Sequence, residues 1–145
     1  MRRGLGAALP ALAVFVAACG NSSAPGPGSV VSSYLSAVGV GNYANACRIL
    51  DHSTRVSLET RSGRRTACAK VIARCLPNEA TAFARDQTQQ LYANVNLSFT
   101  NGSNVAVAVV SGTAVARTVK RVTLRQERGI WRLTSPGASV ERCRR

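Results

Sequence analysis

The chain contains few of the residues from which catalytic and metal sites are usually built. Its 145 residues include six Asp and Glu and one His, against 19 Lys and Arg. One histidine and widely spaced cysteines match none of the C-x-x-C or H-x-x-x-H spacings that place ligands around a metal. A glycine-rich phosphate loop and a G-x-S-x-G nucleophile motif are also missing from the sequence. We therefore expect no metal site and no bound cofactor.

The sequence also has no apolar run long enough to span a bilayer as a helix. The run from Leu5 to Ala18 is 14 residues long and follows two arginines, an order typical of a secretory signal peptide. It ends in VAACG, which resembles the lipobox of bacterial lipoproteins and implies cleavage before Cys19 and attachment of a diacylglycerol to its sulfur. We therefore expect residues 1–18 to be a lipoprotein signal peptide and Cys19 to anchor the chain at the extracytoplasmic face of the cell membrane.

The stretch GNSSAPGPGS after Cys19 contains no large apolar residue and resists helix formation. We expect residues 19–29 to be the lipidated cysteine and a flexible tether, whose ten residues reach at most roughly 35 Å when fully extended. Residues 30–145 are then 116 residues, a common size for a single domain with one core.

Helical periodicity extends over residues 30–76, with Ser29 as the expected N-cap of the first helix and Asn42 as that of the second. The basic segment TRSGRR interrupts this region as a loop. Residues 79–91 are expected to hold one further short helix.

From Tyr92 onward the hydrophobic period becomes two. YANVNLSF is expected to pair with VAVAVV through the turn NGSN, and TVKRVTLRQ with IWRL through a turn at Arg128 and Gly129. Helices followed by an antiparallel meander predict an α+β domain, with the helices on one face of the sheet. Trp131 is expected to anchor the last strand in the core and not to form a ligand platform.

Four cysteines follow Cys19, and an even number in an exported protein is first interpreted as disulfides. They are Cys47, Cys68, Cys75 and Cys143. The predicted helix TACAKVIARCL separates Cys68 from Cys75 by roughly 10 Å along its axis, whereas bridged Cα atoms lie within about 7 Å. Two pairings therefore stay open, in which Cys47 binds either Cys68 or Cys75 and Cys143 binds the other.

The order VVSSYLSAVGVGNYANACRIL, then CA after a basic loop, then VAVAVV and a terminal VTLRQERGIWRL resembles small exported lipoproteins of the nuclear transport factor 2-like superfamily, which are common in actinobacteria. The resemblance implies a cystatin-like cone, in which a strongly curved antiparallel sheet surrounds a long N-terminal helix and encloses a pocket. It also implies a disulfide between the cysteines of AC and CA, here Cys47 and Cys68. This favours Cys75 with Cys143 as the second pair.

Cys47, Asp51 and His52 lie within six positions, as a thiol nucleophile and its base would. On a helix, however, Cys47 and His52 are about 140° apart and do not face each other, and an oxidising compartment favours Cys47 as half of a disulfide. We therefore expect no catalytic dyad, with Asp51 and Ser53 as helix caps. The other acids also follow no inward strand pattern; they are Glu59, Glu79, Asp86, Glu127 and Glu141.

Positive charge is concentrated near the C-terminus, because nine of the 17 Lys and Arg beyond residue 18 lie in the last 29 positions. By strand parity Arg121 and Arg125 share a sheet face, which Arg132 joins across the hairpin. This stripe is a candidate site for anionic lipids or acidic envelope polymers; the alternative is a solvated sheet face. Nucleic acid is not expected as a partner outside the cytoplasm.

These features together predict a lipid-anchored cell-envelope protein whose domain binds a small apolar ligand or an envelope protein without catalysis. One alternative is an enzyme of the isomerase or cyclase kind, which needs a pocket carboxylate as general base. The other is a module that docks on anionic envelope surfaces through its arginines.

Overall fold

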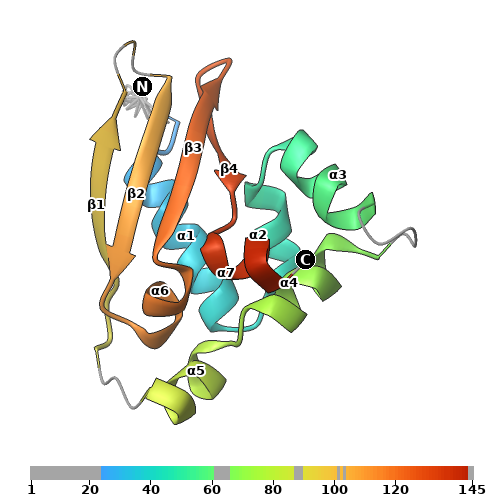
Figure 1. Cartoon of the computed structure of the whole chain (residues 1–145). Coiled ribbons are helices and arrows are strands. Elements are labelled where there is room, and N and C mark those ends of the chain that lie inside the picture. The colour runs from blue at the N-terminus through green and yellow to red at the C-terminus, as the bar shows by residue number, and fades with distance from the viewer. Residues whose placement is uncertain (1–23, 61–65, 87–89, 101, 103, 144–145) are drawn as a thin grey trace, which may run out of the picture.

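The computed structural model describes residues 24–60, 66–86, 90–100, 102 and 104–143 (Figure 1). The expected signal peptide, Cys19 and the basic loop at 61–65 lie outside these residues. The described helices are α1 (Pro27–Gly39), α2 (Tyr43–Ile49), α3 (His52–Thr60), α4 (Cys68–Cys75), α5 (Glu79–Asp86), α6 (Ala114–Val119) and α7 (Ala138–Cys143). The described strands are β1 (Asn94–Phe99), β2 (Val105–Ser111), β3 (Arg121–Glu127) and β4 (Ile130–Ser135).

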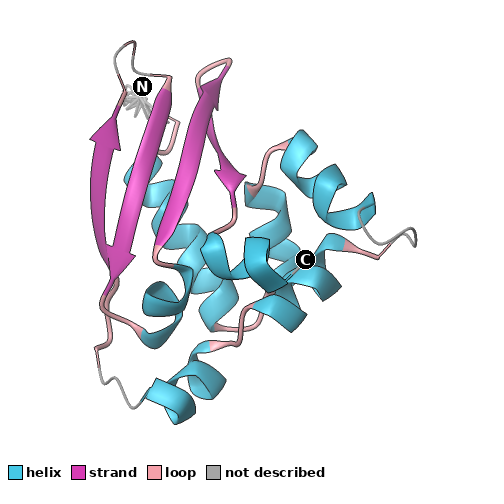
Figure 2. Ribbon diagram, viewed as in Figure 1, coloured by secondary structure: helices cyan, strands magenta, loops and turns pink. Residues whose placement is uncertain are grey.

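The four strands form an open antiparallel sheet in the order β1-β2-β3-β4, and the helices gather on one side of it (Figure 2). This confirms the predicted α+β class and both predicted hairpins. The β3–β4 turn places Arg128 at φ 51° and Gly129 at φ 81°. Two successive residues with positive φ are typical of a type I′ turn, whose twist matches that of the flanking strands.

Helix α1 provides the central apolar surface against which the sheet packs. It begins at Pro27, two residues before the N-cap expected at Ser29, and Gly26 is its N-cap. Proline is favoured at the first helical position because its missing N–H has no helical partner there, so the predicted tether overlaps the start of the helix. The buried residues recur at helical spacing and are Val31, Tyr34, Leu35, Ala37 and Val38.

Tyr34 joins α1 to the segment that follows β4. Its ring is fully buried, and its hydroxyl donates a hydrogen bond of 2.9 Å to the carbonyl oxygen of Pro136. Burial raises the pKa of Tyr34 well above that of a free phenol, because a buried phenolate would lose its hydration. The hydroxyl therefore stays a hydrogen-bond donor, and its bond to Pro136 holds the segment between β4 and α7 in place.

Two aromatic rings meet over the inner face of the sheet. Phe99 on β1 and Trp131 on β4 belong to opposite edge strands, yet their ring centroids are 6.2 Å apart in an edge-to-face arrangement. Strands lie about 4.8 Å from their neighbours, so the backbones of β1 and β4 are about 14 Å apart in a flat sheet, and the two large side chains extend toward each other across this distance. Ala106 is the register partner of Phe99 and leaves room above β2 for the two rings to meet. Trp131 is 9 % exposed, as expected for a core anchor.

Helix α6 corrects the sequence prediction, and α7 lies where no element was predicted. Thr118 and Val119, which strand periodicity assigned to a hairpin, form the last turn of α6, and β3 begins at Arg121. Two caps stabilise α6: the Thr113 hydroxyl accepts from the backbone N–H of Ala116, and the carboxylate of Glu79 accepts from the first two N–H groups of the helix. The second cap comes from α5, so local periodicity does not contain it.

Candidate functional site

The four described cysteines form two disulfides, the pairs favoured above. Cys47 and Cys68 join α2 to α4 with Cα atoms 6.1 Å apart, and both are buried. Cys75 and Cys143 join α4 to α7 with Cα atoms 5.5 Å apart, and Cys143 is exposed. A sulfur in a disulfide is not a thiolate nucleophile, so Cys47 has a structural role here.

Asp51 and His52 mark the beginning of α3. One carboxylate oxygen of Asp51 accepts from the backbone N–H of Thr54 at 2.7 Å, and the other accepts from the hydroxyl of Ser53 at 3.0 Å. Asp51 is only 8 % exposed, and these bonds satisfy its charge. His52 is exposed beside Arg55. Asp51 is therefore a helix cap, as expected, whereas Ser53 lies inside α3 and bonds to that cap.

The other described carboxylates hold structural contacts or face solvent. Glu59 accepts from the N–H of Cys68, Glu141 accepts from Ser135, and Glu127 is exposed. Glu79 borders a groove beside α1 that Leu91 and other residues also line. Both oxygens of Glu79 already accept from the N-terminus of α6. The described carboxylates thus include none that is both in a cavity and free to act as a base.

One hydrogen bond separates Arg132 from the other two arginines of the predicted stripe. Arg121 and Arg125 are exposed on β3, and Arg125 lies opposite Arg132 in the β3–β4 register. The guanidinium of Arg132, however, donates at 2.7 Å to the carbonyl of Arg48 near the C-terminus of α2. A cation there satisfies a helix carbonyl and complements the helix dipole. Arg132 therefore has a structural bond, which leaves Arg121 and Arg125 as the outward cations of the stripe.

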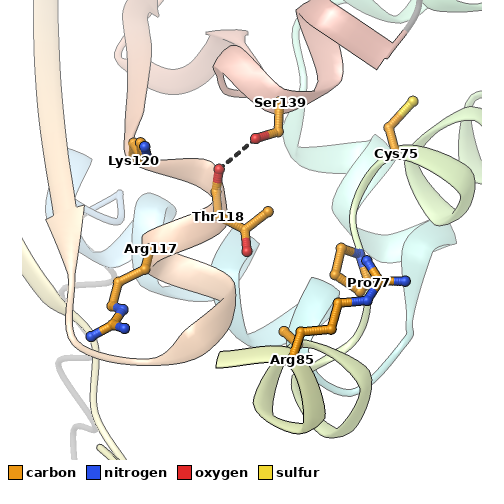
Figure 3. Close-up of a pocket in the computed structure, with 8 residues that line it drawn as sticks. Cys75, Pro77, Arg85, Arg117, Thr118, Lys120 and Ser139 are labelled. Atoms are coloured by element: carbon orange, nitrogen blue, oxygen red, sulfur yellow. Dashed lines mark hydrogen bonds between the residues drawn. The ribbon is translucent and has the colours of Figure 1, made fainter. Parts of the chain in front are cut away.

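A basic cavity of about 480 Å³ lies among the C-terminal part of α4, α5, α6 and α7 (Figure 3). Three of its lining residues are cations, Arg85 from α5 and Arg117 and Lys120 from α6 and its C-cap. Figure 3 shows Arg85 on one side of the hollow and Lys120 on the other. The remaining lining residues are Cys75, Pro77, Ala82, Thr118 and Ser139.

The hydroxyl groups of this cavity are engaged within the fold. Thr118 donates to the carbonyl of Ala114 at 3.0 Å, and Ser139 donates to the carbonyl of Thr118 at 2.6 Å. Arg142 approaches from α7 and donates to the Ser139 hydroxyl oxygen at 3.4 Å. Because the hydroxyl protons are committed, the attraction of the cavity for an anion comes from its arginine and lysine side chains.

Lys120 has an unusual backbone conformation at the edge of the cavity, with φ 64° and ψ −53°. This is close to the strained γ-turn region, which costs a non-glycine residue on the order of 1–3 kcal/mol. Its N–H donates to Ala116 and its carbonyl accepts from Val110, so the neighbouring elements hold it in place. Strain of this kind is concentrated at functional sites, which supports the cavity as the candidate site.

The substitution Lys120→Gly is expected to raise stability and weaken anion binding at once. Glycine adopts positive φ without strain, so the free energy of unfolding should rise by about 1 kcal/mol. Loss of the ammonium group should weaken the binding of inorganic pyrophosphate several-fold. Urea denaturation and calorimetric titration measure the two effects, and Lys70→Gly on α4 is the control, which should lower stability without changing binding. A stabilised variant with unchanged affinity would exclude Lys120 from the site.

Sequence reasoning did not find this cavity. Arg117 and Lys120 belong to the basic C-terminal region, but nothing in the sequence links them to Arg85, 32 positions before Arg117. The link depends on α6, whose last turn strand periodicity assigned to a hairpin, and on α7, which was not predicted. Among the described residues, no group of three or more His, Cys, Asp or Glu could hold a metal ion.

Over the residues that the structure describes, no helix is both long and apolar enough to cross a membrane.

Comparison with known proteins adds no relative from which a role could be transferred. No protein-family model, curated protein or solved structure matches this chain.

Proposed function

We propose that this protein is a lipid-anchored cell-envelope protein whose α+β domain binds an anionic ligand without catalysis. The observation that carries the proposal is the basic cavity, in which Arg85, Arg117 and Lys120 line one hollow of about 480 Å³. No described carboxylate lines it. Such a cavity favours the binding of a small anion over general-base chemistry, so the isomerase or cyclase alternative has less support.

The cavity also changes the expected ligand from apolar to anionic. The interface between α1 and the inner face of the sheet, where the family resemblance places a pocket, is packed with fully buried side chains. These include Val31, Tyr34, Val38, Ala106, Ala108, Val122, Leu124 and Leu133. Dense packing there favours the basic cavity at the periphery as the binding site.

The fold is consistent with membership of the nuclear transport factor 2-like superfamily, which we retain as a proposal together with an actinobacterial origin. A 13-residue N-terminal helix packs on an antiparallel sheet of four strands. A disulfide joins the second helix to the helix that begins with CA. Both are features that the resemblance implies.

Processing at Cys19 is tested by the variant Cys19→Ser in a bacterial host. The mature wild-type chain is expected to begin at Cys19 and to carry a diacylglyceryl group, whereas the variant should accumulate with residues 1–18 attached. Mass spectrometry of the N-terminal peptide measures both. Cys143→Ser is the control, since it removes a cysteine without touching the lipobox. An identical N-terminus and no lipid in either chain would contradict the proposal.

A further inference from the structure

One end of the domain, which we call the hairpin end, combines exposed apolar and cationic side chains. Phe99 at the end of β1 is 55 % exposed, and Ile130 at the start of β4 is 48 % exposed. Arg125 on β3 and Arg128 in the β3–β4 turn are both exposed. The hairpin end is defined by these four residues.

The start of α1 lies at this same end of the molecule. A Cβ atom built on Gly28 would be 3.5 Å from the side chain of Leu97, two residues before Phe99. In Figure 1 the beginning of α1 lies toward the end of the view that holds the tip of β1 and the β3–β4 turn, with α5 and α6 toward the opposite end. The chain that precedes Ala24 therefore joins the domain at the hairpin end.

The length of that preceding chain limits how far the hairpin end can be from a lipid on Cys19. Five residue steps separate Cys19 from Ala24, and a fully extended chain covers about 18 Å over that length. A lipid anchor at Cys19 would thus hold this end, and not the basic cavity, next to the bilayer.

We propose that the hairpin end docks on the surface of an anionic bilayer, so that the basic cavity faces away from the membrane. This inference rests on the proposed lipid anchor. Half-exposed Phe and Ile side chains enter the boundary between head groups and acyl chains, while arginines pair with lipid phosphates. Arg125 and Arg128 have one described carboxylate beside them, that of Glu127, so the net charge of the hairpin end is positive.

A second copy of the chain is a poorer occupant of this surface than a lipid bilayer. Two copies meeting through the same patch would bring Arg125 and Arg128 of one close to those of the other. Beyond residue 18 the chain has 17 Lys and Arg against six Asp and Glu, so approach of two processed copies is also opposed at longer range. An anionic bilayer is complementary to both features.

Trp131 provides a built-in probe of docking, because it is the only tryptophan of the chain and contacts Phe99. The full processed protein is mixed with vesicles of phosphatidylglycerol and phosphatidylcholine whose acyl chains carry bromine, a short-range quencher. We expect Trp131 fluorescence to fall in anionic vesicles and to recover with salt. Arg125→Ser with Arg128→Ser should remove at least half of the quenching.

The control replaces two exposed cations elsewhere, Lys70→Ser with Arg74→Ser, and should keep the full quenching. Arg125→Lys with Arg128→Lys should also keep most of it, which separates loss of charge from loss of fold. Flotation of the same samples reports the lipid anchor independently. Vesicle-bound protein with unquenched Trp131 would overturn docking and leave the anchor intact, and quenching equal in both double Ser variants would overturn the role of the hairpin end. Protein that neither floats nor shows quenching would contradict both proposals.

Discussion

Replacing Gly112 with alanine is expected to lower the free energy of unfolding by about 3 kcal/mol or more, the largest effect of a single methyl group in this domain. Gly112 connects β2 to α6 with φ +100°. A Cβ atom there would lie 2.5 Å from the carbonyl oxygen of Tyr92 and 3.3 Å from the Cα of Ala93. Both atoms belong to the backbone segment that leads into β1. Relief of the clash therefore requires movement of this edge strand.

Gly102→Ala is the matched control for this prediction. Gly102 has nearly the same φ, +99°, but a Cβ atom there would have no neighbour within 4 Å. The substitution at Gly102 should therefore lower the free energy of unfolding only by the conformational strain, about 1 kcal/mol. Urea denaturation of both variants measures the difference. Equal losses would show that the contact with Tyr92 contributes nothing.

Removal of the two disulfides is expected to have large but different effects. By the chain-entropy model, losing the Cys47–Cys68 bridge costs about 3 kcal/mol for its sequence separation of 21, and losing the Cys75–Cys143 bridge costs about 4 kcal/mol for its separation of 68. Only the second bridge holds α7, which provides Ser139 to the basic cavity. Alanine pairs at these positions should therefore separate stability from binding.

Loss of the Cys75–Cys143 bridge should speed hydrogen exchange at Val140 and weaken pyrophosphate binding by the folded protein. Loss of the Cys47–Cys68 bridge should lower the denaturation midpoint and leave binding by the folded fraction unchanged. Exchange at Val140 that is equally slow without Cys143 would show that packing alone holds α7.

Much of the fold was predictable because its signals are local. The α1 face has apolar residues at helical spacing, Asn42 accepts from the N–H of Asn45 as the expected cap, and the β3–β4 turn occurs at Arg128 and Gly129. The alternation of apolar and polar residues in the last strand also predicted that Trp131 points into the core. Its contact with Phe99 was not predictable, because the two residues lie on opposite edge strands of the sheet, whose order is set by tertiary structure.

The candidate site was not predictable for a related reason. The last residues of α6, Thr118 and Val119, continue the β-branched pattern of the next strand, and the Glu79 carboxylate that caps this helix comes from 35 positions earlier. Strand parity did place Arg125 and Arg132 side by side, but it could not reveal that Arg132 bonds to the end of α2. The residues that line the basic cavity are therefore brought together only by the tertiary structure.

The most direct test of the account is a titration of the whole protein with inorganic pyrophosphate, followed by backbone amide chemical shifts. Saturable shifts are expected at Arg85, Lys120 and Ser139, with at least tenfold weaker binding in the double variant Arg85→Ser with Lys120→Ser. The double variant Lys70→Ser with Arg74→Ser removes the same charge from α4 and should bind as the wild type does. Shifts that never saturate, or equal weakening in both variants, would contradict a specific anion site in the basic cavity.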